Sequence, residues 1–224
     1  MRAVILSDIH ANFEALKALD SVIRGADLCI CLGDFIGYYC QVNEVLDFIR
    51  ARDVLCIRGN HDNFLTAGCP ESASEAVRFG IDYADRVIHP DHRRWLAQLP
   101  LLWGGFLGGA AGCSLLLCHG SPWQPLEDYL YADSALLPQL EQFSFDLIAF
   151  GQTHRPLLIE QASRLRLNPG SVGQSRHWPS VACAAVVEVS AHPSVTLIEI
   201  PYDAEPVIRL AVQAGAREWI RKHL

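Results

Sequence analysis

Short apolar runs alternate with helical patterns over the first part of the chain. Residues 3–6, 28–32 and 54–57 are apolar runs of strand length, and apolar side chains recur at helical spacing between them. Asn12 is placed to cap the first helix, and the second helix is predicted over residues 42–49. This strand-helix-strand-helix-strand order predicts parallel strands joined by right-handed crossovers.

The rest of the chain is richer in strand patterns than in helical patterns. Helices are predicted over residues 71–83, 91–97 and 134–142, and two short helices are predicted in the tail, 204–224. Further strands are expected at residues 101–106, 113–118, 147–150, 157–161, 165–168, 181–189 and 195–200. The first two form a hairpin around a turn rich in glycine and alanine, and the last four form an antiparallel run.

The number of strands favours two stacked sheets, because roughly nine or ten strands crowd a single twisted sheet. The predicted fold is a mixed α/β (α+β) fold, a four-layer α-β-β-α sandwich of two mixed β-sheets flanked by helices. A length of 224 residues suits one domain, so residues 1–224 are expected to form a single domain. Hydrophobic residues make up 50% of the chain, which is enough for a sizeable core.

Composition narrows the function classes. The formal net charge is −7 and no lysine or arginine run stands out, so extended nucleic acid is not an expected partner. No apolar stretch is long enough to span a membrane, and the amino-terminal apolar run is too short for a signal peptide. The cysteines form no C-x-x-C pair and lie mostly in apolar runs, which is typical of a reducing compartment. We expect a cytoplasmic protein that does not interact with membranes.

Polar side chains follow five of the predicted strands, at the point where each strand ends. In open α/β sheets, ligands bind beyond the carboxyl ends of the strands, so these side chains are expected at one rim. They are Asp8 and His10, then Asp34, then Asn60, His61 and Asp62, then His119, and finally Gln152 and His154.

The donor types at this rim indicate a metal site. Two carboxylates, Asp8 and Asp34, would repel each other if no cation lay near them. Mixed carboxylate, imidazole and amide donors suit Mn²⁺, Fe or Zn²⁺ better than Ca²⁺, which prefers oxygen alone. The loops contain no thiolate, which argues against a structural zinc site.

Each motif taken alone has an ordinary structural explanation. Asp8 and His10 could form a turn that caps a helix, and Gly33-Asp34 is a common turn pair. His119 could be a buried histidine whose hydrogen bonds are satisfied. Only the combination, with each motif following a strand, favours a metal site over these alternatives.

The motif order resembles that of the calcineurin-like metallophosphoesterase superfamily. The motifs are D-x-H, G-D, G-N-H-D, H-G and G-x-x-H, in that order along the chain. The match is closer to its small bacterial and archaeal phosphodiesterase branch, which is related to diadenosine tetraphosphatase. That branch also has G-D-x-x-G-Y, here residues 33–38, N-P-G-S, here residues 168–171, and a late P-Y-D, here residues 201–203. The resemblance covers almost the whole chain.

This resemblance implies a centre with two divalent metal ions, with Mn²⁺ as the first candidate and Fe, Zn²⁺, Ni²⁺ or Co²⁺ as alternatives. A hydroxide held between the ions would attack the phosphorus of a small phosphate ester or nucleotide-like substrate. His61 is similar to the general acid of the family, and Asp62 is expected to orient its imidazole. The implied ligands are Asp8, His10 and His154 for one ion, Asp34 as a bridge, and Asn60, His119 and the position of Gln152 for the other ion.

One position departs from the family pattern. The superfamily has G-H-x-H where this chain has Gln152, and an amide is a weaker donor than imidazole. We therefore expect weaker binding or a different metal preference at the second position. An alternative function is a non-catalytic binding or scaffold protein on a degenerate fold, because a retromer subunit of this superfamily has lost catalysis. A third alternative, hydrolysis of esters other than phosphate esters, has no support beyond the metal chemistry.

Several other side chains remain open between two roles. Arg155 and Arg176 could bind a substrate phosphate or be solvated surface charges. Trp123, Tyr129 and Tyr131 could stack on a nucleobase or pack under a long loop. The histidines without a partner pattern are expected at the surface; they are His89, His92, His177, His192 and His223. A homo-oligomer stays open, because an edge strand could pair two chains.

Overall fold

The first of two five-stranded sheets contains the amino-terminal strands. The computed structural model describes residues 1–161, 164–222 and 224. In this sheet the strand order is β10-β9-β1-β2-β3, and β1, β2 and β3 run parallel as predicted. Strand β9 pairs antiparallel with both β1 and β10. The strands are β1 (Arg2–Leu6), β2 (Leu28–Cys31), β3 (Val54–Cys56), β9 (Val181–Glu188) and β10 (Ser194–Pro201).

The second sheet has the strand order β4-β5-β6-β8-β7. Its inner strands β5, β6 and β8 are parallel, and the edge strands β4 and β7 pair antiparallel with β5 and β8. The strands are β4 (Leu102–Leu107), β5 (Cys113–Cys118), β6 (Leu147–Ala149), β7 (Pro156–Gln161) and β8 (Arg164–Pro169).

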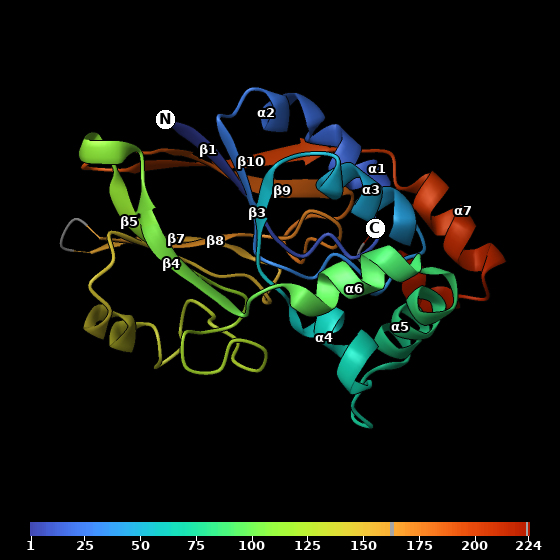
Figure 1. The fold of residues 1–224 in the computed structure, drawn as a ribbon. Helices are drawn as coiled ribbons and strands as arrows, with labels where there is room; N and C mark the ends of the chain where they lie inside the picture. The colour runs from blue at the N-terminus through green and yellow to red at the C-terminus, as the bar shows by residue number, and fades with distance from the viewer. Residues whose placement is uncertain (162–163, 223) are drawn as a thin grey trace.

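The helices gather mainly on one side of the molecule (Figure 1). They are α1 (Phe13–Ala18), α2 (Asp20–Arg24), α3 (Val42–Arg50), α4 (Asn60–Ala67), α5 (Glu75–Val87), α6 (Pro90–Gln98) and α7 (Glu205–Gln213). Three short 3₁₀ segments are η1 (Gly109–Ala111), η2 (Pro138–Gln142) and η3 (Glu218–Arg221). None of the helices in the described part of the chain has the length and apolar character that crossing a membrane requires.

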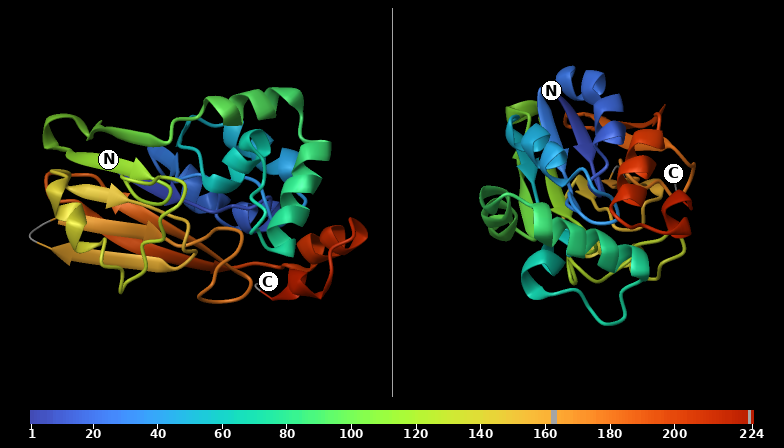
Figure 2. Two further views of the ribbon diagram at one scale, coloured as in Figure 1. Left: turned by 90° about the horizontal axis from the view of Figure 1, so that it is seen from below. Right: turned by 90° about the vertical axis from the view of Figure 1, so that its right-hand side faces the viewer.

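Alternating side chains of the strands build a layered core. Ala3 and Ile5 of β1 join the cluster that fills the space between the two sheets, whereas Val4 and Leu6 join the cluster under the helices. A third cluster, which includes Leu137 from the segment around η2, covers the outer face of the second sheet. Figure 2 shows the two sheets from below and the helices from their own side. The predicted mixed α/β fold with two stacked mixed sheets is confirmed.

The predicted antiparallel run of the last four strands is wrong. It divides between the sheets, because β7 and β8 belong to the second sheet and β9 and β10 to the first. Strand β9 is buried along nearly its whole length, which requires a position between two other strands. Its two neighbours are β1 and β10, and β8 belongs to the other sheet.

Some predicted helix bounds are also wrong. The helix expected at 71–83 begins at Glu75, because the Ser74 side chain caps it by accepting from the Val77 N–H. The segment 134–142 forms only the 3₁₀ segment η2. The first helix is interrupted at Leu19 and continues as α2. The two short helices predicted in the tail correspond to α7 and η3, and His223 lies outside the described residues.

Candidate metal centre

The loops that leave β1 and β2 are held together by backbone hydrogen bonds at the carboxyl end of the first sheet. The Asp8 N–H donates to the Gly33 carbonyl (3.0 Å), and the His10 N–H donates to the Asp34 carbonyl (2.9 Å). On the second sheet, the Gly151 N–H donates to the His119 carbonyl (2.7 Å). The carboxyl ends of parallel strands thus meet at one rim, as expected for this class of sheet.

The rim also concentrates strained backbone. Left-handed φ values are rare for residues other than glycine and cost on the order of 1–3 kcal/mol each. Five candidate ligands adopt them: Asp8 (φ 56°), His10 (53°), Asp34 (57°), Gln152 (64°) and His154 (57°). Such strain persists only where the surrounding structure requires it, and it clusters at functional sites.

Asp34 lies against the amino terminus of α4. Its Oδ1 accepts from the His61 N–H at 2.8 Å. A Cβ atom at Gly59 would stand 2.1 Å from the same oxygen, so only glycine permits this close approach. Asn60 begins helix α4, whose positive end faces the Asp34 carboxylate.

The Asp62 carboxylate does not contact the His61 imidazole. It accepts from the N–H groups of Asp34 (2.8 Å), Phe35 (3.0 Å) and Gly59 (3.0 Å). Burial and the nearby charge of Asp34 raise the pKa of Asp62 to about 7. The expectation that Asp62 orients His61 is corrected: Asp62 caps α4 and holds the backbone on which Asp34 lies.

His10, His119 and His154, the rim histidines, share one hydrogen-bond pattern. The Nδ1 atom of each lies within bonding distance of a backbone carbonyl: Ile36 (3.1 Å), Leu32 (2.8 Å) and Gln174 (2.9 Å), respectively. A carbonyl oxygen only accepts, so each Nδ1 must carry a proton. In the neutral ring Nε2 then holds a lone pair, which is the arrangement typical of histidine bound to metal.

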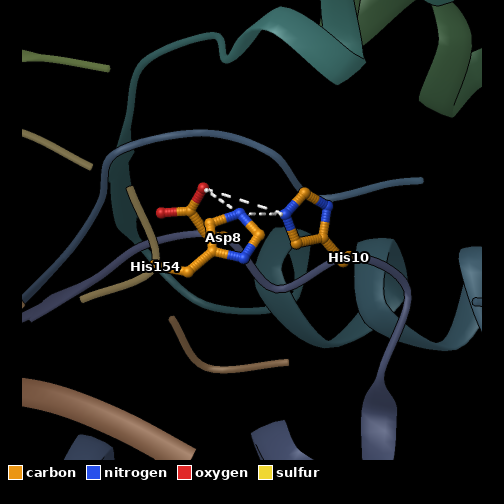
Figure 3. A group of neighbouring side chains, drawn as sticks. All are labelled: Asp8, His10 and His154. Atoms are coloured by element: carbon orange, nitrogen blue, oxygen red, sulfur yellow. Dashed lines mark hydrogen bonds and ion pairs between the residues drawn. The ribbon is translucent and has the colours of Figure 1, made fainter. Parts of the chain in front are cut away.

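The Nε2 atoms of the rim histidines converge on the two carboxylates. His154 Nε2 lies 3.3 Å from Asp8 Oδ1, and His119 Nε2 lies 3.4 Å from Asp34 Oδ2. His10 Nε2 lies 3.0 Å from His154 Nε2 and 3.8 Å from Asp8 Oδ1 (Figure 3). Two nitrogen lone pairs so close together repel each other unless a positive charge lies beside them.

Asn60 and Gln152 supply amide groups to the same rim. Asn60 Oδ1 lies 3.0 Å from His119 Nε2. Gln152 Oε1 is buried beside Gly120, directly after His119, and it has no hydrogen-bond partner among the described residues. All seven candidate ligands are buried, and Asn60 is the most exposed of them at 7%. Six of the seven candidate ligands thus have donor atoms close to one another, whereas Gln152 reaches the centre through its backbone N–H, which donates to Asp8 Oδ2 at 3.1 Å.

The protein groups alone partly balance the buried negative charge. Burial would raise the pKa of Asp8, but the charges of His154 and His119 lower it to about 2. Despite burial, His119 and His61 hold the pKa of Asp34 well below its ordinary value. Burial would lower the pKa of His119, but Asp34 and Asp8 raise it to about 10. The centre thus keeps both carboxylates charged and needs positive charge beside them.

These residues fit divalent metal ions. Three overlapping groups have donor atoms within 4.8 Å of one another, and Asp8 and Asp34 connect them. Asp8 Oδ1 is buried without a hydrogen-bond partner among the described residues, and such an atom is costly unless a cation binds it. The groups are Asp8 with His10 and His154, His10 with Asp34 and His61, and Asp8 with Asp34 and His119.

His61 lies beside this cluster. Its Nε2 is 3.9 Å from Asp34 Oδ2, and its Nδ1 is buried without a hydrogen-bond partner among the described residues. Burial lowers the pKa of the imidazole. A Cβ atom at Gly37, where φ is +99°, would stand 2.2 Å from the His61 Nδ1, so this glycine leaves room for the ring.

Arg155 and Arg176 line one cavity that also includes Tyr38. The Tyr38 ring centroid lies 4.7 Å from that of His10 and 5.0 Å from that of His61. Its hydroxyl lies 3.5 Å from an Arg176 Nη2 atom. Sequence reasoning gave Tyr38 no role, although the G-D-x-x-G-Y motif marks its position.

The aromatic residues of the loop after His119 divide between the two interpretations left open above. Trp123 packs against Phe143, with ring centroids 5.4 Å apart, which agrees with a packing role. Tyr129 and Tyr131 stack on each other and are 46% and 38% exposed. His92, expected at the surface, is only 4% exposed because its side chain, on α6, packs against Arg50 and Asp47 of α3.

Comparison with known proteins agrees with this geometry. Residues 1–192 match the calcineurin-like phosphoesterase superfamily domain, and the chain belongs to that family. An uncharacterised protein of Methanocaldococcus jannaschii is 27% identical over 242 residues, covering 98% of this chain and 96% of the other.

Two solved structures share the whole fold. A metallophosphoesterase from Sphaerobacter thermophilus is 26% identical, with a TM-score of 0.83 over 100% of this chain and 98% of the other. A hypothetical protein from Pyrococcus horikoshii OT3 is 19% identical, with a TM-score of 0.82 over 99% and 96%. The resemblance inferred from the motifs is confirmed, and the family fold implies divalent metal ions.

Proposed function

We propose that this protein is a phosphoesterase with two divalent metal ions, and specifically a phosphodiesterase acting on a small phosphate ester or nucleotide-like substrate. One observation supports the proposal above all others. The rim histidines each turn Nε2 toward Asp8, Asp34 or one another, while Nδ1 donates to a backbone carbonyl.

The proposed ligands are Asp8, His10 and His154 for one ion, Asp34 for both, and Asn60, His119 and Gln152 for the other. When bound, such ions supply an activated water at neutral pH and offset the charge of the phosphoryl oxygens. The backbone hydrogen bonds of the rim hold these side chains in place before any substrate arrives, so little reorganisation is needed. Mn²⁺ is the first ion to test, because the donor set mixes oxygen and nitrogen.

His61 is proposed as the general acid that protonates the departing oxygen. Burial lowers the pKa of its imidazole, so the ring needs a nearby negative charge to hold a second proton. Asp34, at 3.9 Å, is assigned to the ions, so an anionic phosphate ester bound beside the ring would supply that charge. Protonation of His61 would therefore be favoured when the substrate is bound.

The proposal is tested with metal-stripped protein to which Mn²⁺ is added. We expect hydrolysis of bis(p-nitrophenyl) phosphate, and we expect His61→Ala to reduce turnover by about 10²–10⁴-fold, the usual contribution of a general acid. His192→Ala is the matched control, because His192 is an exposed histidine in the turn between β9 and β10. Absence of turnover with Mn²⁺, Fe²⁺, Zn²⁺, Ni²⁺ and Co²⁺ across several phosphate esters would contradict the enzyme proposal.

A non-catalytic scaffold is the second candidate, and Gln152 is the observation that favours it. An amide replaces the family histidine at this position, although its buried oxygen has no hydrogen-bond partner among the described residues and could still bind a metal ion. The turnover assay separates the two candidates, because a scaffold would bind metal without hydrolysing any of the esters.

We also propose that residues 1–224 act as one domain. Strand β10 completes the first sheet, and η3 contributes a wall to the cavity that contains Arg155 and Arg176.

All eight cysteines are free thiols, and seven of them are buried, which supports a reducing, cytoplasmic location.

A further inference from the structure

One cavity beside the metal centre has a wall made by the carboxy-terminal segment. The cavity has a volume of about 570 Å³. Its inner side contains Tyr38, whose ring contacts His10 and His61, and Gln174, whose carbonyl accepts from His154. Its outer side contains Trp219, which lies beyond residue 192, where the match to the family ends. The carboxy-terminal wall of the cavity is therefore built by residues outside the segment that matches the family.

The cavity is positively charged although the whole chain is acidic. Arg155, Arg176 and Lys222 line it, and none of them forms an ion pair with a carboxylate among the described residues. One acidic residue, Glu75, also lines it, and Arg217 already pairs with that carboxylate at 3.1 Å. The free charge of the cavity thus favours an anionic ligand.

Three residues of the cavity wall also have buried polar atoms that lack a hydrogen-bond partner among the described residues. Gln174 is 3% exposed, and its Oε1 has no hydrogen-bond partner among the described residues. The Nε1 of Trp219 and the Nε of Arg176 are buried donors that are likewise unpaired in the described chain. Buried polar atoms are costly to leave unpaired, so the fitting ligand presents both acceptors and donors.

An aromatic ring in the ligand would match the Trp219 side chain in the cavity wall. Trp219 is held edge-on against Phe79 of α5, with ring centroids 5.3 Å apart, which fixes the indole in the wall. The volume is within the range of sites for small organic ligands. An anionic group, an aromatic ring and a polar ring edge occur together in a nucleoside monophosphate.

We propose that this cavity binds a nucleoside 5′-phosphate group, as the non-reacting arm of the substrate. Arg176 lies at the inner end, where its guanidinium approaches the Tyr38 hydroxyl, and it holds the anionic group. Trp219 stacks on the base, and Gln174 bonds its edge. That this group belongs to the substrate rests on the proposed function. That the cavity binds a nucleoside 5′-phosphate does not rest on it.

The test is calorimetric binding of two probes, adenosine 5′-monophosphate and ribose 5-phosphate, to metal-free protein. Without metal, binding reports on the cavity and not on the centre. We expect adenosine 5′-monophosphate to bind about tenfold more tightly, as base stacking predicts. Trp219→Ala should remove that advantage, and Arg176→Ala should weaken both probes alike.

Control variants separate the site from general effects on folding. Trp219→Phe keeps an aromatic ring against Phe79 and should retain most of the advantage. Phe106→Ala removes an exposed ring on β4, and Arg209→Ala removes an exposed charge on α7, so both should bind like the wild type. Equal binding of the two probes to the wild type, or an undiminished advantage in Trp219→Ala, would overturn the proposal.

This outcome is independent of the turnover assay with Mn²⁺. Turnover without binding of adenosine 5′-monophosphate would leave the phosphoesterase and refute the nucleotide site. Nucleotide binding without turnover of any ester would leave the site and refute the enzyme.

Discussion

Two regions of the protein bury histidine, and they differ in what surrounds the second ring nitrogen. Each of the rim histidines gives one N–H to a backbone carbonyl, and the other nitrogen faces carboxylates, an amide oxygen or another imidazole. Between α3 and α6, His92 accepts from Arg50 through Nδ1 (2.8 Å) and donates from Nε2 to Asp47 (3.0 Å). Both nitrogens of His92 are therefore engaged by other side chains.

The comparison shows that burial does not distinguish the two uses of histidine. His92 is 4% exposed and His154 is 3% exposed. The difference lies in the partners: at His92 a cation and an anion complete the hydrogen bonds, whereas at the rim anions accumulate without enough donors. A buried histidine is a candidate ligand when one nitrogen remains free and faces a carboxylate.

The largest effect is expected from Asp34→Asn. This change removes the carboxylate that lies near His10, His61 and His119 and keeps a residue type that tolerates a left-handed backbone. We expect loss of bound metal, measured by mass spectrometry, and turnover reduced by about a hundredfold or more, because charge stabilisation at a metal centre is worth several kcal/mol.

Asp47→Asn is the matched control, because Asp47 is the carboxylate that faces His92. It should leave metal content and turnover unchanged. Equal metal loss in the two variants, or none in Asp34→Asn, would remove the distinction between the regions.

A moderate effect is expected from Gln152→His, which restores the histidine of the family pattern. If Gln152 is a ligand, imidazole should tighten the weaker of two metal-binding steps by about tenfold, or about 1.4 kcal/mol. Calorimetric titration with Mn²⁺ measures both steps. Unchanged affinity and stoichiometry would show that Gln152 does not bind the ion.

The smallest effect is expected from His92→Gln, measured as stability against pH. Burial lowers the pKa of His92, and a second proton on Nδ1 would break the bond from Arg50. A lowered pKa means that the fold favours the neutral ring. This contribution is therefore complete above the unfolded pKa of about 6.5 and is lost as the pH falls through the folded value.

Glutamine can accept from Arg50 and donate to Asp47 without titrating. Urea unfolding at pH 7 and pH 5 should show a larger loss of stability in the wild type than in His92→Gln, by on the order of 1 kcal/mol, the value of one hydrogen bond. An identical pH dependence in the two proteins would contradict the neutral assignment of His92.

The contrast between the two regions also explains which features could be predicted from sequence. The rim residues each follow an apolar strand, so local periodicity places them at one edge. His92 has no such signal, because Asp47 and Arg50 lie on α3, more than 40 residues earlier in the chain. The same reason explains Asp62, whose carboxylate accepts from the loop after β2 rather than contacting the adjacent His61.

The sequence by itself determined where most strands and helices lie and which polar residues follow the strands. These depend on hydrophobic periodicity and on turn residues, which act over a few neighbouring positions. Only the tertiary structure decided that β9 pairs with β1, that each rim histidine bonds a carbonyl through Nδ1, and that Trp219 forms a cavity wall. Those features depend on contacts between segments far apart in the chain, and no local pattern records which distant segment a residue will meet.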